Sequence, residues 1–97
     1  MKAYVGDIGT AIEVNTFIDL TAATTMEFRV RKPDTTEEVW TATIPEALTA
    51  VDGILTHLSE AGDFDQPGKY RIQAYIETLT TAHLGETAYF DVYDAFQ

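Results

Sequence analysis

Strict alternation of apolar and polar side chains over two segments is the feature that most constrains this fold. In residues 25–32 and 69–77, apolar side chains recur at every second position, from Met26 to Val30 in the first segment and from Tyr70 to Ile76 in the second. Successive side chains of a strand point to opposite faces, so both segments are predicted to be half-buried strands. The side chains predicted to face the core are Met26, Phe28 and Val30 in the first strand, and Tyr70, Ile72, Ala74 and Ile76 in the second.

Shorter segments with the same character fill the rest of the chain. Pro33–Thr36 is a turn signal, and the return strand of a hairpin is predicted at 38–44, with Trp40 as its core anchor. Further strands are predicted at 53–58 and 86–93, and residues 2–5 and 11–14 are expected to be two halves of one edge strand. Turn signals every 8–12 residues are typical of a β-sandwich. We therefore expect one all-β domain over residues 1–97, an antiparallel sandwich of six to seven strands.

Charge and cysteine content exclude several classes of function. Six basic residues against sixteen acidic ones give a net charge of -10, which repels phosphate backbones and anionic lipids. We therefore expect neither a nucleic-acid partner nor a membrane partner. Since the chain has no cysteine, it has no disulfide, no thiolate zinc site and no thiol nucleophile.

The only serine lies in the one segment that could suggest catalysis. Ser59, His57 and Asp63 could be assigned as nucleophile, base and orienting acid. However, all three lie in one short stretch without a glycine-flanked elbow. We expect no enzyme activity, and we expect Ser59 to be a solvent-facing strand end.

Metal sites and cofactors are not expected either. Glu60, Asp63 and Asp65 could offer oxygen ligands to calcium, but the register of an EF-hand fails. A looser calcium site and an acidic turn that caps backbone donors are the two alternatives for this segment. His57 and His83 lie on different segments without a third ligand, so we expect two surface histidines.

The outward face of the predicted sheet is the candidate for an interaction site. Tyrosine and arginine are enriched at interface hot spots because they bury a large area; the alternative is that tyrosine and threonine simply favour strands. Arg29, Arg31 and Lys32 are expected to pair with neighbouring carboxylates. The residues predicted for the interaction face are Thr41, Thr43, Arg71, Gln73, Tyr75, Tyr89 and Tyr93.

The segment Asp65–Ile72 resembles the tyrosine corner of immunoglobulin-like domains, although it has one extra residue between Asp65 and Gly68. This resemblance implies an immunoglobulin-like sandwich in which the Tyr70 hydroxyl bonds backbone a few residues upstream. It also implies that Phe28, Trp40 and Ile72 take the places of the family's cysteine, tryptophan and cysteine.

A wider resemblance involves Tyr4–Thr10, the Arg31–Asp34 turn, Trp40–Thr43, Gly62–Glu77 and Gly85–Thr87. These segments resemble small bacteriophage proteins similar to the N-terminal immunoglobulin-like domain of baseplate upper proteins. The chain departs from that pattern at Thr35, where a glycine is usual, and in the 80–84 loop, which lacks aromatic and basic residues.

This resemblance implies a structural or adaptor role in a phage particle, as a tail, baseplate or capsid-surface component made in the host cytoplasm. The implied partners are other virion proteins, in a homo-oligomer or a larger assembly, with no catalytic residues. The alternative is a carbohydrate-binding module or host-surface adhesin, in which exposed aromatic rings stack on sugars. The predicted burial of Trp40 argues against that alternative.

Overall fold

A computed structural model describes residues 2–97 of this chain; Met1, the first residue of the expected domain, lies outside the described residues. The described part contains no α-helix, and no helix in it is long and apolar enough to cross a membrane. Its elements are β1 (Ala3–Tyr4), β2 (Ala11–Asn15), β3 (Thr25–Arg31), β4 (Glu37–Thr41), the 3₁₀ turn η1 (Ala50–Asp52), β5 (Ile54–Leu58), β6 (Gly68–Glu77), β7 (Ala82–Leu84) and β8 (Ala88–Tyr93).

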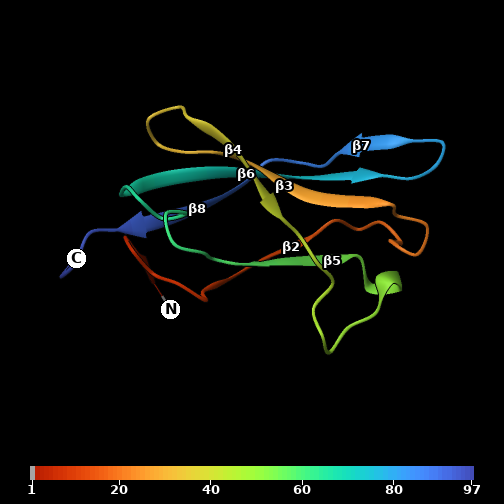
Figure 1. Ribbon diagram of the computed structural model, residues 1–97, viewed down its shortest axis with the longest axis horizontal. Coiled ribbons are helices and arrows are strands. Elements are labelled where there is room, and N and C mark those ends of the chain that lie inside the picture. The colour runs from red at the N-terminus through yellow and green to blue at the C-terminus, as the bar shows by residue number, and fades with distance from the viewer. Residues whose placement is uncertain (1) are drawn as a thin grey trace.

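The strands form one large sheet and one small sheet (Figure 1). The large sheet has the order β1-β8-β6-β3-β4, and β7 pairs with the second half of β6. The small sheet is the antiparallel pair β2-β5, which lies along one side of the large sheet. The prediction of an all-β domain is confirmed, but the sheet is mixed because β1 runs parallel to β8.

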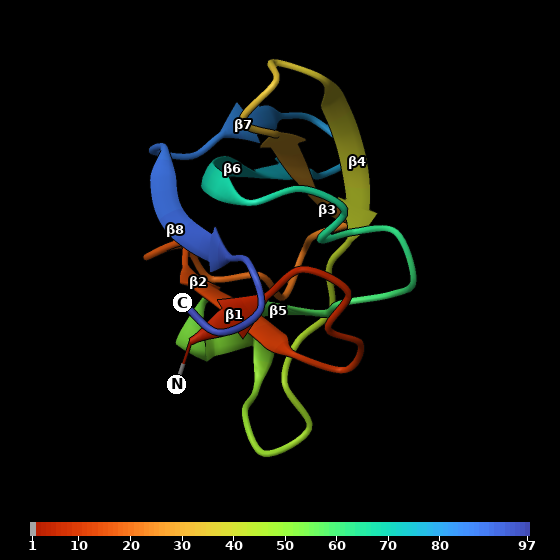
Figure 2. The same ribbon diagram turned by 90° about the vertical axis from the view of Figure 1, so that its left-hand side faces the viewer.

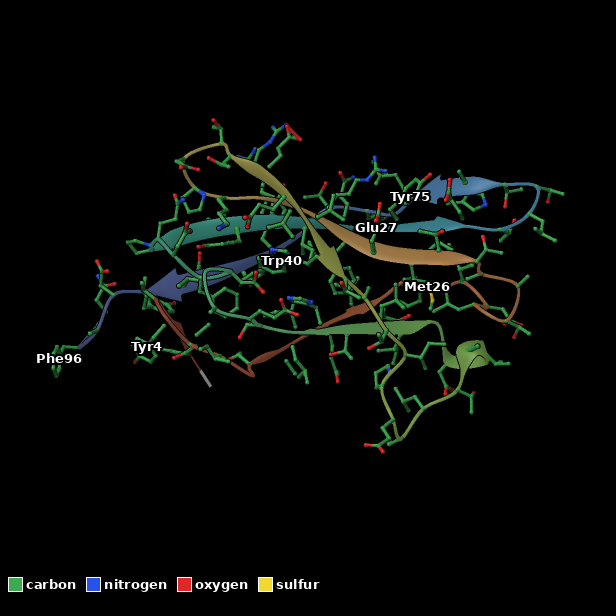
Figure 3. The ribbon with its side chains drawn as sticks, in the orientation of Figure 1. Tyr4, Met26, Glu27, Trp40, Tyr75 and Phe96 are labelled. Carbon is green, nitrogen blue, oxygen red and sulfur yellow. The ribbon has the colours of Figure 1, made fainter. Side chains whose placement is uncertain are left out.

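Both alternating segments form strands, as predicted, and they pair with each other in the centre of the large sheet. Their apolar positions face the small sheet, where they meet Leu55 of β5 and Phe64 of the following loop. Figure 3 shows Trp40 and Met26 between the two layers. The buried side chains of β3, β6 and the neighbouring β4, each at most 3% exposed, are Phe28, Val30, Trp40, Tyr70, Ile72, Ala74 and Ile76.

The two N-terminal segments are not halves of one edge strand. β1 belongs to the large sheet, whereas β2 pairs with β5 in the small sheet. The chain crosses between the layers at Gly6–Thr10, and buried Ser59 holds this crossing. Its hydroxyl accepts a hydrogen bond from Thr10 N (3.0 Å) and donates one to Asp7 O (3.2 Å). Ser59 is therefore not the solvent-facing strand end that was expected.

The predicted strand 38–44 also divides between the layers. β4 ends at Thr41, and Thr43 forms a bridge with Thr56 of β5. Phe28 lies directly opposite Trp40, and Ile72 opposite Val30, all in the large sheet. Phe28 and Ile72 therefore cannot occupy cysteine positions that link two sheets, and this part of the expected correspondence is wrong.

Candidate docking groove

The outer face of the large sheet, turned away from β2 and β5, carries a groove of about 470 Å³. All three arginines of the chain line it, two from β3 and one from β6. They meet because β3 pairs with β6 and because arginines occupy outward positions on both strands. The lining residues are Arg29, Val30, Arg31, Glu37, Glu38, Val39, Arg71, Ile72, Gln73, Thr87 and Tyr89.

The three arginines differ in how they are paired. Arg29 lies 3.5 Å from Glu27 and stacks over the ring of Tyr75 at 4.0 Å. Arg31 lies 3.6 Å from Glu37 across the hairpin. Arg71 has no carboxylate partner among residues 2–97.

Arg31 and Arg71 are cross-strand neighbours at the same position of the ladder. Like charges directly opposite each other on one face destabilise a sheet. The fold therefore accepts an unfavourable arrangement in which the guanidinium of Arg71 stays available to a carboxylate or phosphate, which a guanidinium fork binds bidentately.

Tyr75 extends the groove toward β7. The hydrogen bond that its hydroxyl donates to Glu77 (2.8 Å) raises the pKa of Tyr75 above its ordinary value. Figure 3 shows Glu27 and Tyr75 on the side of the sheet opposite Trp40. Tyr75 thus stays a neutral phenol with Arg29 stacked on its ring.

Only some residues of the predicted interaction face lie in or beside the groove. Arg71, Gln73 and Tyr89 line the groove, and Thr41 and Tyr75 lie on the same face beside it. Tyr93 lies at the far end of β8, where its ring contacts Tyr4 and Lys2. Thr43 was assigned wrongly, because it lies beyond β4 and pairs with the small sheet.

Sequence reasoning missed Arg29 and Arg31 as members of the groove. Their ion pairs with carboxylates were predicted and are found. Their outward position follows from the alternation of β3, but their proximity to Arg71 depends on which strands pair. No local pattern contains that information.

Lys32 pairs with carboxylates, as predicted, but it does so in the buried interior and not on the outer face. Its side chain is 3% exposed, and its ammonium lies 2.8 Å from Glu38 and 2.9 Å from Asp65. Burial alone would lower the pKa of Lys32, but the bonds to the two carboxylates outweigh burial and raise it. The same hydrogen bond lowers the pKa of Asp65. Lys32 thus joins β3, β4 and the loop before β6 and is not available to a ligand.

His57 is buried, at 6% exposed, so its prediction as a surface histidine is wrong; His83 is exposed as expected. The ring of His57 stacks on Trp40 at 4.9 Å. Its two nitrogens lie 2.7 Å from Thr41 O and from an Asp63 carboxylate oxygen. These contacts and the stacking on Trp40 hold the ring between β4 and the loop after β5.

The segment after β5 brings together neither a catalytic triad nor a metal cluster. The Ser59 hydroxyl bonds to residues 7 and 10 rather than to His57. Asp63 bonds His57 and caps Glu60 N, and Asp65 bonds Lys32. The expected capping of backbone donors is found here. Residues 2–97 hold no group of three His, Cys, Asp or Glu side chains placed to bind a metal.

Comparison with protein-family models, with curated proteins and with solved structures found no match for this chain.

Proposed function

We propose that this protein is a non-enzymatic structural or adaptor protein of a phage particle that acts through protein-protein contacts, and that the groove on the outer face is its docking site. The observation that carries the proposal is the gathering of all three arginines on one face of a protein with a net charge of -10. Arginine and tyrosine in a groove are the composition of an interface hot spot.

We also propose that the fold is an immunoglobulin-like sandwich. The hydroxyl of buried Tyr70 donates a hydrogen bond to Gln66 O, four residues upstream, at 2.8 Å. This contact has the form of a tyrosine corner, and the small sheet against the large one supports a two-layered architecture. The resemblance to baseplate domains and the corner together support the virion as the place where this protein acts.

Incorporation into particles and contact through the groove are tested separately. A photoreactive amino acid at Val39, which is 60% exposed in the groove, is expected to cross-link to a neighbouring chain in assembled particles. Leu79, which is 92% exposed in the turn after β6, is the matched control and is expected to give no such product. Purified particles without this chain contradict the virion assignment. Particles with it but without a Val39 cross-link contradict the docking site.

The carbohydrate-binding alternative loses its best platform, because Trp40 is 3% exposed between the layers. Its indole nitrogen also donates to Glu38 (3.3 Å). A change in Trp40 fluorescence on addition of glycans would favour this alternative over docking.

A further inference from the structure

Lysine and arginine are confined to the large sheet and the ends of its strands, whereas carboxylates occur on both sides of the molecule. Five of the six cations lie on β3, at its end, or on β6 of the large sheet. Residues 6–24 and 42–60 form the small sheet and the loops around it, and they contain no lysine or arginine. We call these two segments the acidic layer; its carboxylates are Asp7, Glu13, Asp19, Glu46, Asp52 and Glu60.

Figure 2 shows the small sheet β2-β5 on one side of the large sheet. The groove, lined by outward residues of β3, β4 and β6, lies on the other side. Glu13, Glu46 and Glu60 are exposed, and among residues 2–97 their side chains form no hydrogen bond or ion pair. On the other side, Arg71 lacks a carboxylate. Arg71 of one molecule is therefore complementary in charge to the unpaired carboxylates on the acidic layer of a second molecule.

We propose that the groove takes the acidic layer of a second copy of this chain, so that copies stack head to tail. This inference rests on the proposed docking function and names its partner. The contact is heterologous, because two different surfaces meet, and such contacts repeat into rings or filaments. Bidentate pairing of Arg31 and Arg71 with carboxylates of the neighbour removes the repulsion between the two guanidinium groups.

The net charge of -10 opposes any association of copies, but distance limits this repulsion. At about 0.1 M salt the screening length is about 10 Å. The shortest extent of the molecule is 19 Å. Carboxylates on the far sides of two stacked copies are therefore screened. In the contact itself, the three arginines attract the neighbour's carboxylates, whereas Glu37 and Glu38 of the groove lining repel them.

Light scattering and sedimentation of the purified chain test the proposal. We expect a mass above the 10.8 kDa of one chain at about 0.1 M NaCl, and a return to one chain at about 1 M. Arg71→Gln is expected to lower the association constant by at least about tenfold. Lys69→Gln removes the same charge from the same face of β6, outside the groove lining, and is expected to change it less than about threefold.

A mixing experiment separates head-to-tail stacking from other contacts. One variant, Arg31→Glu with Arg71→Glu, loses the groove; the other, Glu13→Gln with Glu46→Gln and Glu60→Gln, loses the acidic layer. Each alone is expected to stay a single chain, and their equimolar mixture is expected to form pairs and nothing larger. Circular dichroism and Trp40 emission like those of wild type show that both variants fold.

Several outcomes overturn the inference. A wild-type chain that stays single at millimolar concentration and about 0.1 M NaCl excludes the second copy. Equal effects of Arg71→Gln and Lys69→Gln exclude the groove, and a mixture without pairs excludes the acidic layer. If the chain stays single while Val39 cross-links to a different particle protein, the proposal that a second copy binds the groove is wrong, and the proposed function stands. If Val39 gives no product in particles that contain the chain either, the binding of a second copy and the docking site in the groove are both contradicted.

Discussion

The interior between the two layers and the docking groove treat charged side chains in opposite ways. In the interior, Lys32 is buried, and its ammonium is bonded to Gly62 O and to the carboxylates of Glu38 and Asp65. In the groove, Arg71 is exposed and has no carboxylate partner within residues 2–97, although Arg31 lies directly opposite. The comparison teaches that charge in the interior stabilises the fold, whereas charge in the groove is left for a partner.

Lys32→Met is the change expected to cost the most stability. Methionine fills the space but leaves Glu38, Asp65 and Gly62 O without their donor. Both carboxylates are partly exposed and can be hydrated, so we expect a loss of about 2 kcal/mol in the free energy of unfolding, less than for a fully buried pair. Urea unfolding followed by Trp40 fluorescence measures it. Lys69→Met on the exposed face is the control, and an equal loss there would contradict the structural role of Lys32.

Tyr70→Phe removes one buried hydrogen bond and keeps the ring. The carbonyl of Gln66 loses its 2.8 Å donor, so we expect the free energy of unfolding to fall by about 1 kcal/mol. Tyr89→Phe, at a half-exposed ring in the groove, serves as the control and is expected to have no measurable effect. Unfolding free energies that do not differ between the two variants would show that the corner contact adds nothing.

The dependence of stability on acid distinguishes the two regions further. The hydrogen bond from Lys32 lowers the pKa of Asp65 below its ordinary 3.8. The ionised Asp65 thus contributes stability above pH 3.8, and this contribution is lost as the pH falls through the lowered pKa. We expect a small effect, because the carboxylate is half exposed. Asp65→Asn should give a flatter unfolding profile in this range, and a profile as steep as that of wild type would exclude the contribution of Asp65.

Arg71→Gln is expected to change stability least. The free energy of unfolding should stay within about 0.5 kcal/mol of wild type, and relief of repulsion from Arg31 favours a slight gain. Thermal unfolding checks this expectation. A loss of 1 kcal/mol or more would mean that Arg71 holds the fold together, and the contrast between groove and interior would then disappear.

The strands were predictable because alternation is a local property. The pattern of 25–32 and 69–77 alone places Phe28 and Tyr70 inside and Arg29 and Arg71 outside, as found. The turn at Thr35 is likewise a local feature of the sequence. Thr35 has a φ of 73°, a backbone conformation in which glycine is favoured. The local turn signal at Pro33–Thr36 therefore located this turn correctly, although a threonine occupies the position with positive φ.

What could not be predicted depends on contacts between distant segments. The burial of His57 follows from the ring of Trp40, seventeen positions away in sequence, and from the Asp63 loop that closes over it. The groove exists because β3 lies between β4 and β6. The alternation of each strand allows other neighbours, so the sequence predicted outward arginines but not their convergence.

The N-terminal strand lies beside the C-terminal one, and the Tyr4 hydroxyl donates a hydrogen bond to Gln97 O at 3.2 Å. A linker of a few residues could therefore join Lys2 to Gln97, and new ends could be opened in the exposed turn at Leu79. Such a circular permutant would require no change in strand pairing. The same arrangement of strands could thus form from a chain with a different order of strands. Such a chain would still carry the groove.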